Sequence, residues 1–442
     1  MNSTNNMKGK VKILLLGYSD SDTTGHVYGT FEKLPKVFDK RLVVFSTVKK
    51  NRQIAFVDGT TLLGRIKRRI IQEVQNLIRC ISVKTKVRVD VNRLYHHFYG
   101  NEYTLITAKQ ILNKHKGFNP DVISIHWVAE FISSKTIRDL YRLTGAKIVF
   151  SFVDEQHMTG GCHYPVDCKE YLSGCKHCPA LEHGKKVAAI QMKKKIDNLQ
   201  NIPKFVVGSP YDCRLVRDTP IFRDAVFFPN IAIPVMHRYS REEARKIFNI
   251  EEYEFVIMIG ANSLTDVRKG MRYSIDAIKL FAQNHTDVCV LAPGNQGSAK
   301  CFDVGTARSV YPGFLDYAKL SAAYCAADCF VSTTLADSGP KMVTFAISQD
   351  TPVVSFDLGF AQDVVLHKKT GYIARYMDTE DVAEGIEFIY DRRKDAFREQ
   401  CRLIVEKIKN RPNGWMQLYD FIMKEHYCPV KAGKSVFEIV ET

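Results

Sequence analysis

The sequence predicts an α/β protein with two doubly wound parallel sheets. Short apolar runs of strand length alternate with amphipathic helical patterns over most of the chain, and this alternation is typical of parallel sheets. The pattern starts at residues 11–17, closes near residues 204–210 and starts again after residues 226–234. At about 100 to 200 residues per domain, 442 residues form two or three domains. We therefore expect two Rossmann-like domains that face a cleft.

The first half of the chain contains an ordered set of strand signals. The apolar run at residues 11–17 ends in glycine and leads into a polar loop. Two further strands are expected at residues 121–127 and 146–154, with a helical pattern between them. These signals predict an N-terminal domain of residues 1–229, in which residues 159–180 form a Cys-rich loop.

The second half repeats the pattern from a new first strand at residues 254–261. A helix is expected at residues 272–283 and a further strand at residues 287–294. Residues 326–337 then run from a strand into a loop. We expect a C-terminal domain of residues 230–412, followed by residues 413–442, which carry a last amphipathic helix.

Residues 337–348 contain an acid, a Ser-Gly-Pro turn and a helical pattern. The turn follows a predicted strand at residues 330–333, and Pro340 suits the first turn of the following helix. A helix N-terminus reached through such a loop presents unpaired N–H groups and a positive dipole end, which favour anions. Ligands in doubly wound sheets bind at this edge, beyond the carboxyl ends of the strands.

The formal net charge of +15 predicts anionic partners. Much of it lies in residues 65–88, where the helical pattern also has an apolar stripe. Three interpretations stay open: a surface helix packed on its own domain, attachment to an anionic membrane surface, and non-specific nucleic-acid binding. No motif for specific nucleic-acid recognition accompanies the charge. The basic residues of this segment are Arg65, Lys67, Arg68, Arg69, Arg79, Lys84, Lys86 and Arg88, against one acid, Glu73.

Four of the twelve cysteines cluster in the spacing C-x5-C-x6-C-x2-C. They are Cys162, Cys168, Cys175 and Cys178. The last pair has the tight spacing of zinc sites, and His163 and His177 are further candidate ligands. A structural zinc site, reduced thiols and disulfides are the three alternatives. The N-terminus lacks an export signal, and no segment reaches the roughly 20 apolar residues that span a bilayer. This predicts a cytoplasmic protein, a setting that disfavours disulfides.

Four segments resemble the retaining nucleotide-sugar glycosyltransferases of family 4 (group 1), which have the GT-B architecture. The Cys-rich segment resembles a bacterial polysaccharide-biosynthesis subgroup. In this architecture the last helix commonly crosses back to the N-terminal domain. The segments are SDTTGHVYG (21–29), VDEQHMTGGCHYPVDCKEYLSGCKHCPAL (153–181), GANSLTDVRKG (260–270) and DSGPKMVTFAISQDTPVVSFDLG (337–359), the last followed by TGYIA (370–374).

The resemblance implies a donor site in the second domain. Arg268 and Lys269 correspond to the basic pair that holds the donor diphosphate, where charge develops as the glycosidic bond breaks. Asp337 corresponds to a carboxylate that contacts donor-sugar hydroxyls. Asp154 and Glu155, at the end of a strand in the first domain, are candidate catalytic residues that orient an acceptor hydroxyl. The remaining residues of the implied donor site are Gly25, Ser338, Gly339, Pro340 and Lys341.

Three positions depart from the family pattern. Val153 stands where the family has a histidine, Phe345 where it has a ribose-binding carboxylate, and Ile231 where it has a glycine. The resemblance implies a retaining enzyme that moves a sugar from a nucleotide donor to a saccharide or lipid-linked saccharide in polysaccharide assembly. It would act at the inner membrane face and need no cofactor for catalysis. The alternatives are a non-catalytic scaffolding subunit, which the departures favour, and a nucleotide-sugar epimerase of the same architecture.

Overall fold

The computed structural model describes most of the chain. It divides into two compact units, residues 1–230 with 413–442, and residues 231–412. Among the described residues, no helix combines the length and the apolar composition needed to cross a membrane. The described residues are 10–20, 26–46, 53–56, 66, 69–70, 73, 77, 94–98, 102–103, 106–181, 186–231, 233–295, 302–339 and 341–427.

The first unit contains a seven-stranded sheet in the order β3-β2-β1-β4-β5-β6-β7, with all neighbours parallel. The inner strands are buried along nearly their whole length, because helices cover both faces of such sheets. Strands β2 and β3 are added on one side of β1, and β4 to β7 on its other side, so the strand order reverses between β1 and β4. The strands are β1 (Val11–Ser19), β2 (Phe38–Ser46), β3 (Ile54–Phe56), β4 (Val122–Ile125), β5 (Lys147–Ser151), β6 (Lys204–Gly208) and β7 (Val226–Pro229).

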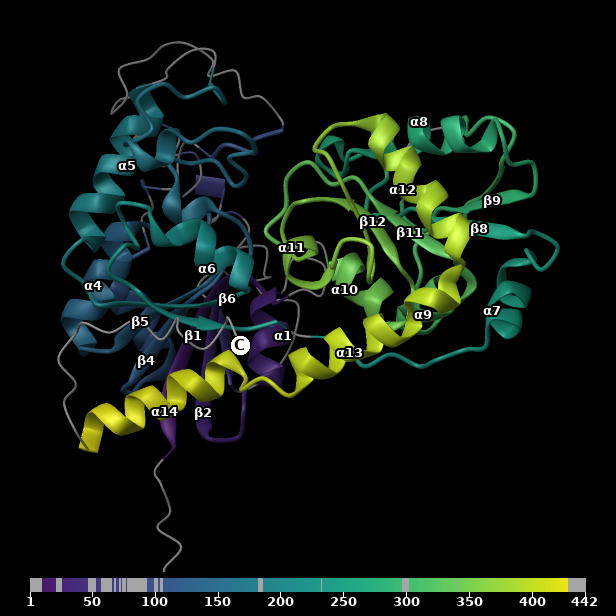
Figure 1. The fold of residues 1–442 in the computed structure, drawn as a ribbon. Coiled ribbons are helices and arrows are strands. Elements are labelled where there is room, and N and C mark those ends of the chain that lie inside the picture. The colour runs from purple at the N-terminus through teal and green to yellow at the C-terminus, as the bar shows by residue number, and fades with distance from the viewer. Residues whose placement is uncertain are drawn as a thin grey trace, which may run out of the picture. The chain divides into compact units, whose positions relative to one another are not determined.

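Helices pack on this sheet through two apolar clusters. Helix α14, yellow in Figure 1, lies along the strands of the first unit and contributes Trp415, Leu418 and Ile422 to the cluster that contains Ile13 and Leu15. The last helix therefore completes the core of the unit that holds the N-terminal strands. Within the described residues, the helices of this unit with defined bounds are α1 (His26–Lys33), α3 (Ala108–Leu112), α4 (Ser134–Thr144), α5 (Lys186–Leu199), α6 (Pro210–Arg217) and α14 (Gly414–Tyr427).

The second unit contains a six-stranded parallel sheet in the order β10-β9-β8-β11-β12-β13. Its strand order reverses between β8 and β11. Both sheets are thus parallel and doubly wound, and the predicted fold class is confirmed. The strands are β8 (Phe255–Met258), β9 (Val288–Leu291), β10 (Arg308–Val310), β11 (Cys329–Ser332), β12 (Val353–Phe356) and β13 (Gly371–Ala374). The helices are α7 (Arg241–Phe248), α8 (Met271–Ala282), α9 (Tyr317–Ala326), α10 (Lys341–Ser348), α11 (Ala361–Val364), α12 (Thr379–Arg392) and α13 (Arg398–Lys409).

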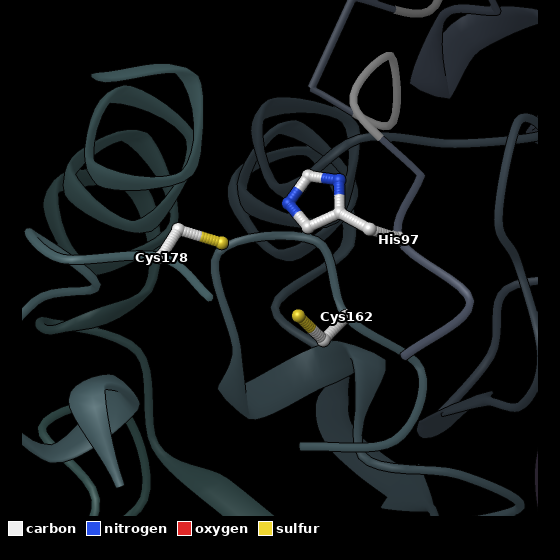
Figure 2. A group of neighbouring side chains, drawn as sticks. All are labelled: His97, Cys162 and Cys178. Atoms are coloured by element: carbon white, nitrogen blue, oxygen red, sulfur yellow. The ribbon is translucent and has the colours of Figure 1, made fainter. Parts of the chain in front are cut away.

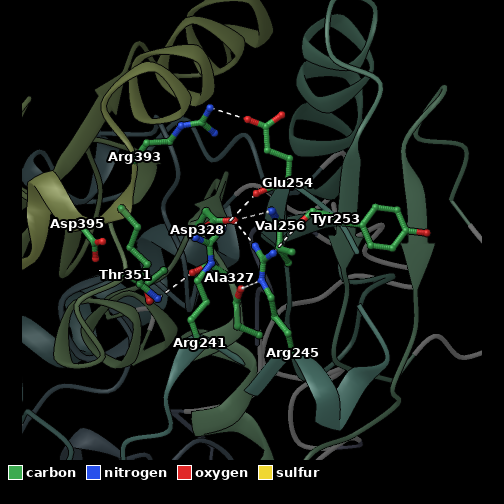
Figure 3. Close-up of polar contacts among 12 residues, drawn as sticks. Arg241, Arg245, Tyr253, Glu254, Val256, Ala327, Asp328, Thr351, Arg393 and Asp395 are labelled. Atoms are coloured by element: carbon green, nitrogen blue, oxygen red, sulfur yellow. Dashed lines mark hydrogen bonds and ion pairs between the residues drawn. The ribbon is translucent and has the colours of Figure 1, made fainter. Parts of the chain in front are cut away.

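A buried ionic network joins α7 to the amino ends of β8 and β11 (Figure 3). Asp328 directly precedes β11, and its Oδ2 accepts hydrogen bonds from Arg245 Nη2 at 2.7 Å and from the Val256 N–H at 2.8 Å. Arg241 pairs with the other carboxylate oxygen at 2.7 Å. Arg245 also donates to the carbonyl oxygens of Tyr253 and Ala326. The network lies at the amino edge of the sheet, and the opposite edge is the one at which doubly wound sheets bind ligands, so we expect it to stabilise the fold.

Candidate functional site

Two loops of the second unit meet at the carboxyl edge of its sheet. One follows β8 and ends at Gly270, and the other follows β11 and ends before α10. The Leu335 N–H donates to the Arg268 carbonyl oxygen at 2.7 Å, and Thr333 Oγ1 donates to the Gly270 carbonyl oxygen at 2.9 Å. The loops lie side by side because β8 and β11 are neighbours in the sheet. This is the position at which doubly wound sheets bind ligands.

Gly270 allows the two loops to approach each other. Its φ is +61°, and a Cβ added at this position would lie 2.0 Å from the Thr333 carbonyl oxygen. Both the left-handed backbone and the contact exclude a larger residue. The glycine that closes the segment at residues 260–270 is therefore required by the packing of the loop beside it.

The charged side chains of the two loops pair with one another or with their own loop. Lys269 Nζ lies 2.5 Å from Asp337 Oδ2, and both side chains are largely shielded from solvent. Asp337 Oδ1 accepts a hydrogen bond from the Gly339 N–H at 2.9 Å. Arg268 Nη2 lies 2.6 Å from Asp266 Oδ2. The carboxylates thus hold two cations next to the loop that leads into α10.

The structure brings together the central residues of the predicted donor site. Ser338 is buried within this loop, and Lys341 is exposed at the first position of α10. A Cβ on Gly339 would lie 2.5 Å from Phe360 Cζ, so the loop packs closely on the segment before α11. The other two predicted residues, Gly25 and Pro340, lie outside the described residues.

Phe345 takes part in aromatic packing on α10. Its ring centroid lies 6.1 Å from that of Tyr317 and 6.4 Å from that of Tyr324, and both tyrosines belong to α9. The carboxylate found at this position in the resembled family is thus replaced by a side chain that joins two helices. This position offers no charged group to a ribose.

Residues 254–392, within the second unit, match the family model described as glycosyl transferases group 1. The second unit therefore contains a region that is similar to the group 1 glycosyltransferases. No curated protein matches the chain. The predicted resemblance to group 1 glycosyltransferases is confirmed, and so is the prediction that the protein is an enzyme of the glycosyltransferase class.

Solved structures similar to this glycosyltransferase cover nearly the whole chain. Sucrose-phosphate synthase from Thermosynechococcus elongatus has a TM-score of 0.60 at 13% identity, over 95% of this chain and 100% of that chain. A UDP-forming α,α-trehalose-phosphate synthase from Burkholderia xenovorans has a TM-score of 0.57 at 11% identity, over 94% and 100%. HepE from Anabaena, in complex with UDP-glucose, has a TM-score of 0.56 at 11% identity, over 93% and 99%. At these identities the likeness concerns the fold, and the predicted two-domain GT-B architecture is confirmed.

The first unit of the glycosyltransferase places Asp154 and Glu155 in buried positions after β5. Asp154 Oδ2 lies 2.6 Å from His163 Nδ1, and its Oδ1 accepts a hydrogen bond from the Gln156 N–H at 3.1 Å. Burial opposes ionisation of Asp154, but the contacts with His163 outweigh it and hold the pKa of this carboxyl below its ordinary value. The Asp154 carboxylate therefore connects the residues that follow β5 to His163. The acceptor role of both acids stays a prediction.

His157 makes the stability of this segment depend on pH. Its ring is buried, its Nε2 lies 2.9 Å from the His126 carbonyl oxygen, and burial lowers its pKa from 6.5 to about 4. Between these values the unfolded chain binds a proton that the folded chain excludes, so we expect stability to fall as pH drops from 6.5 to 4. The contribution of His157 to this loss is about 3 kcal/mol.

Urea denaturation at several pH values, followed by the fluorescence of Trp127 and Trp415, measures this loss. Both tryptophans belong to the first unit. His157→Gln keeps a hydrogen-bond donor but does not titrate, so its stability should vary less across this range. Equal pH dependence in the wild type and the variant would contradict the prediction.

The four clustered cysteines line one small cavity of the first unit. All four are free thiols in the structure. Cys162 and Cys178 lie next to His97, and the ligand atoms of these three buried side chains are within 4.8 Å of one another (Figure 2). A hydrogen bond with Cys162 lowers the pKa of the Cys178 thiol, although burial acts in the opposite direction. Cys168 and Cys175 lie outside this three-residue group.

His97 is the residue that sequence reasoning missed. It is remote from the cysteines in the chain and has no characteristic spacing to them. An antiparallel bridge pairs His97 with Cys162, and the Phe98 N–H donates to the Gly161 carbonyl oxygen at 2.8 Å. His163 and His177, the histidines considered from spacing, are both engaged elsewhere, with Asp154 and Glu170 respectively.

Proposed function

We propose that this glycosyltransferase transfers a sugar from a nucleoside-diphosphate donor to a saccharide or lipid-linked saccharide, with retention of configuration. The observation that supports this most strongly is the pairing of Lys269 with Asp337 across the two loops, at the point where the strand order reverses. Cations and a helix N-terminus are there combined with a carboxylate. Cations and a helix N-terminus bind a diphosphate, and a carboxylate accepts hydrogen bonds from sugar hydroxyls.

The proposed chemistry gives each of these groups a role. As the bond between the sugar and the diphosphate breaks, negative charge develops on a phosphate oxygen, and Lys269 and Arg268 would stabilise it more strongly in the transition state than in the ground state. The N–H groups at the start of α10 would bind the same diphosphate. Asp337 would accept hydrogen bonds from hydroxyls of the donor sugar.

Uridine nucleotides are the first donors to test. Structures with this fold were solved with UDP-glucose in HepE and with UDP-2-fluoro glucose in an E. coli protein named trehalose-6-phosphate. We propose polysaccharide assembly in the cytoplasm as the setting, on the resemblance of the segment at residues 153–181 to a bacterial subgroup.

A thermal-shift screen with nucleotide sugars tests the donor proposal. A donor at 100 times its dissociation constant stabilises the folded state by about 2.7 kcal/mol. This raises the melting temperature by roughly 5 to 10 °C for a domain of this size. The best donor is then incubated with saccharide acceptors, and the products are analysed. A transferred sugar with retained anomeric configuration supports the proposal. An isomerised sugar would identify an epimerase, and a protein that binds no nucleotide sugar would be the scaffolding subunit.

We also propose that residues 65–88 attach the enzyme to an anionic membrane surface. Most of this segment lies outside the described residues. Its described apolar positions, Ile66, Ile70 and Leu77, are helical and 49%, 57% and 60% exposed. Exposed apolar side chains flanked by cations favour the interface of an acidic membrane over packing on the protein's own domain.

Liposomes test this attachment. We expect vesicles with acidic lipids to sediment the protein at low salt and to release it as salt rises, because each basic residue near such a surface contributes about 1 kcal/mol and is screened by ions. Neutral vesicles serve as the control. Equal sedimentation with neutral and acidic vesicles would refute the electrostatic attachment.

A further inference from the structure

We infer that the first unit binds a structural Zn²⁺ ion through His97, Cys162, Cys175 and Cys178. This inference concerns a site apart from the proposed donor site and does not depend on the activity. It also changes the set of ligands expected from sequence, because a histidine from a remote segment replaces Cys168.

The geometry of three side chains supports a metal site. One nitrogen of His97 and the sulfurs of Cys162 and Cys178 are buried and mutually within 4.8 Å. Ligands bound to one zinc ion at about 2.0 to 2.3 Å are separated by distances compatible with this limit. Figure 2 shows the three side chains directed toward a common space, from three different segments of the chain.

The hydrogen bonding of His97 points to a missing partner. The side chain is 5% exposed, and within the described part of the chain neither Nδ1 nor Nε2 has a well-aligned hydrogen-bond partner; the thiol of Cys178, which interacts with the ring, would bind the same ion. Buried polar groups without partners are rare and cost free energy. A metal ion bound by one ring nitrogen would satisfy that nitrogen and account for the position of the ring.

Cys175 is the best fourth ligand. It forms the C-x2-C pair with Cys178, a spacing typical of zinc sites. Its sulfur accepts a hydrogen bond from the Gly160 N–H at 3.2 Å, and such outer contacts stabilise and orient a coordinating group. Cys175 is buried, whereas Cys168 is only partly buried. Both line the same cavity, so Cys168 provides the matched control.

The charge of the surroundings suits this set of ligands. Three thiolates and one Zn²⁺ ion leave one net negative charge in a buried place, which is costly unless a cation lies nearby. Lys195 is a buried cation that interacts electrostatically with Glu102 and Asp154 and also with Cys175 and Cys162. Its Nζ donates to the carbonyl oxygens of Gln156 and Thr159, at 2.5 and 2.9 Å. The lysine thus holds the segment before Cys162 and balances the charge of the site.

Four protein ligands leave no open position, so the zinc would be structural. The ion would connect three segments of the chain. The first contains His97, the second contains Cys162, and the third contains Cys175 and Cys178. Metal removal should therefore loosen these segments first. Hydrogen exchange at residues 94–98 and 159–178 should rise when the metal is removed, while exchange in β4 and β5 should change little.

Metal analysis of the purified full-length protein tests the site. We expect about one zinc per chain after exhaustive dialysis against a metal-free buffer. His97→Ala, Cys162→Ser, Cys175→Ser and Cys178→Ser should each lower the zinc content at least fivefold, whereas Cys168→Ser should keep it. Because some variants can fail to fold, Co²⁺ is also substituted into the wild type, where sulfur-to-metal charge-transfer bands and tetrahedral d–d bands should appear.

The possible outcomes separate the alternatives. A wild-type protein without zinc and without thiolate bands on Co²⁺ addition would overturn the site. Loss of zinc from Cys168→Ser but not from Cys175→Ser would overturn the ligand set. Neither readout involves a nucleotide sugar, so a failure here is distinguishable from a failure of the proposed function.

Discussion

Replacing Lys269 with alanine is expected to lower kcat/KM by about 10² to 10³, equivalent to roughly 2.7 to 4 kcal/mol of transition-state stabilisation. The ammonium group would lie at the leaving diphosphate, where negative charge increases during the reaction. In the structure it is held by Asp337 at 2.5 Å. The lost interaction strengthens as the bond breaks, so kcat should fall more than substrate affinity.

The same substitution should leave the fold intact. The side chain of Lys269 is 21% exposed and makes one ion pair, with a carboxylate that is 16% exposed, so its removal should cost about 1 to 3 kcal/mol, less than the stability of a folded domain. Lys279→Ala is the matched control, because it removes the same charge from α8, where Lys279 pairs with Asp303 at 2.8 Å. The kinetics are measured with the donor that gives the largest thermal shift.

Asp337→Ala should produce a different defect. The carboxylate would contact sugar hydroxyls, so its loss should reduce the discrimination between donor sugars as well as the rate. Lys269→Ala should slow all donors alike, because the diphosphate is common to them. If Lys269→Ala retains wild-type turnover while the wild type is active, the proposed phosphate site is wrong.

Asp328→Ala is expected to destabilise the second unit by about 3 to 5 kcal/mol. The substitution would leave the guanidinium of Arg245, whose side chain is 7% exposed, without its carboxylate, and the Val256 N–H without its acceptor. Arg241 is half exposed and can turn toward water. Most of the cost therefore comes from one buried cation and one buried N–H group.

Native-state hydrogen exchange measures this effect locally. Protection of the amides in β8 and β11 should fall by roughly a hundredfold to a few thousandfold, while β4 and β5 of the first unit serve as an internal reference. Asp303→Ala is the control, because that carboxylate is 79% exposed and pairs with Lys279 on the surface. A loss below about 1 kcal/mol in Asp328→Ala would contradict a structural role for the network.

The fold class could be predicted from the sequence because it depends on local patterns. Apolar runs such as residues 254–261 and 287–294 have the length and composition of buried parallel strands, and their alternation with helical patterns leaves few topologies. The loops after β8 and β11 could likewise be placed at the carboxyl edge of a sheet. Their segments carry glycines and charged residues at positions that a glycosyltransferase family also uses.

Contacts between remote segments were decided only by the tertiary structure. The ion pair of Lys269 with Asp337 forms because β8 and β11 are neighbours in the sheet, an order that depends on long-range packing and not on spacing along the chain. Asp154 and Glu155 follow a strand as expected, but their burial could not be read from two adjacent acids. The pairing of Asp154 with His163 provides the compensation that a buried carboxylate requires.

In the cysteine cluster, too, the sequence predicted some of the site residues and only the tertiary structure identified the others. The chain's own spacing identified four cysteines and favoured a metal site among the alternatives. Only the antiparallel bridge between His97 and Cys162 brings the histidine to the sulfurs. The chain determines local geometry over a few residues, whereas the partner of a buried polar group is set by whichever remote segment the packing of the core brings beside it.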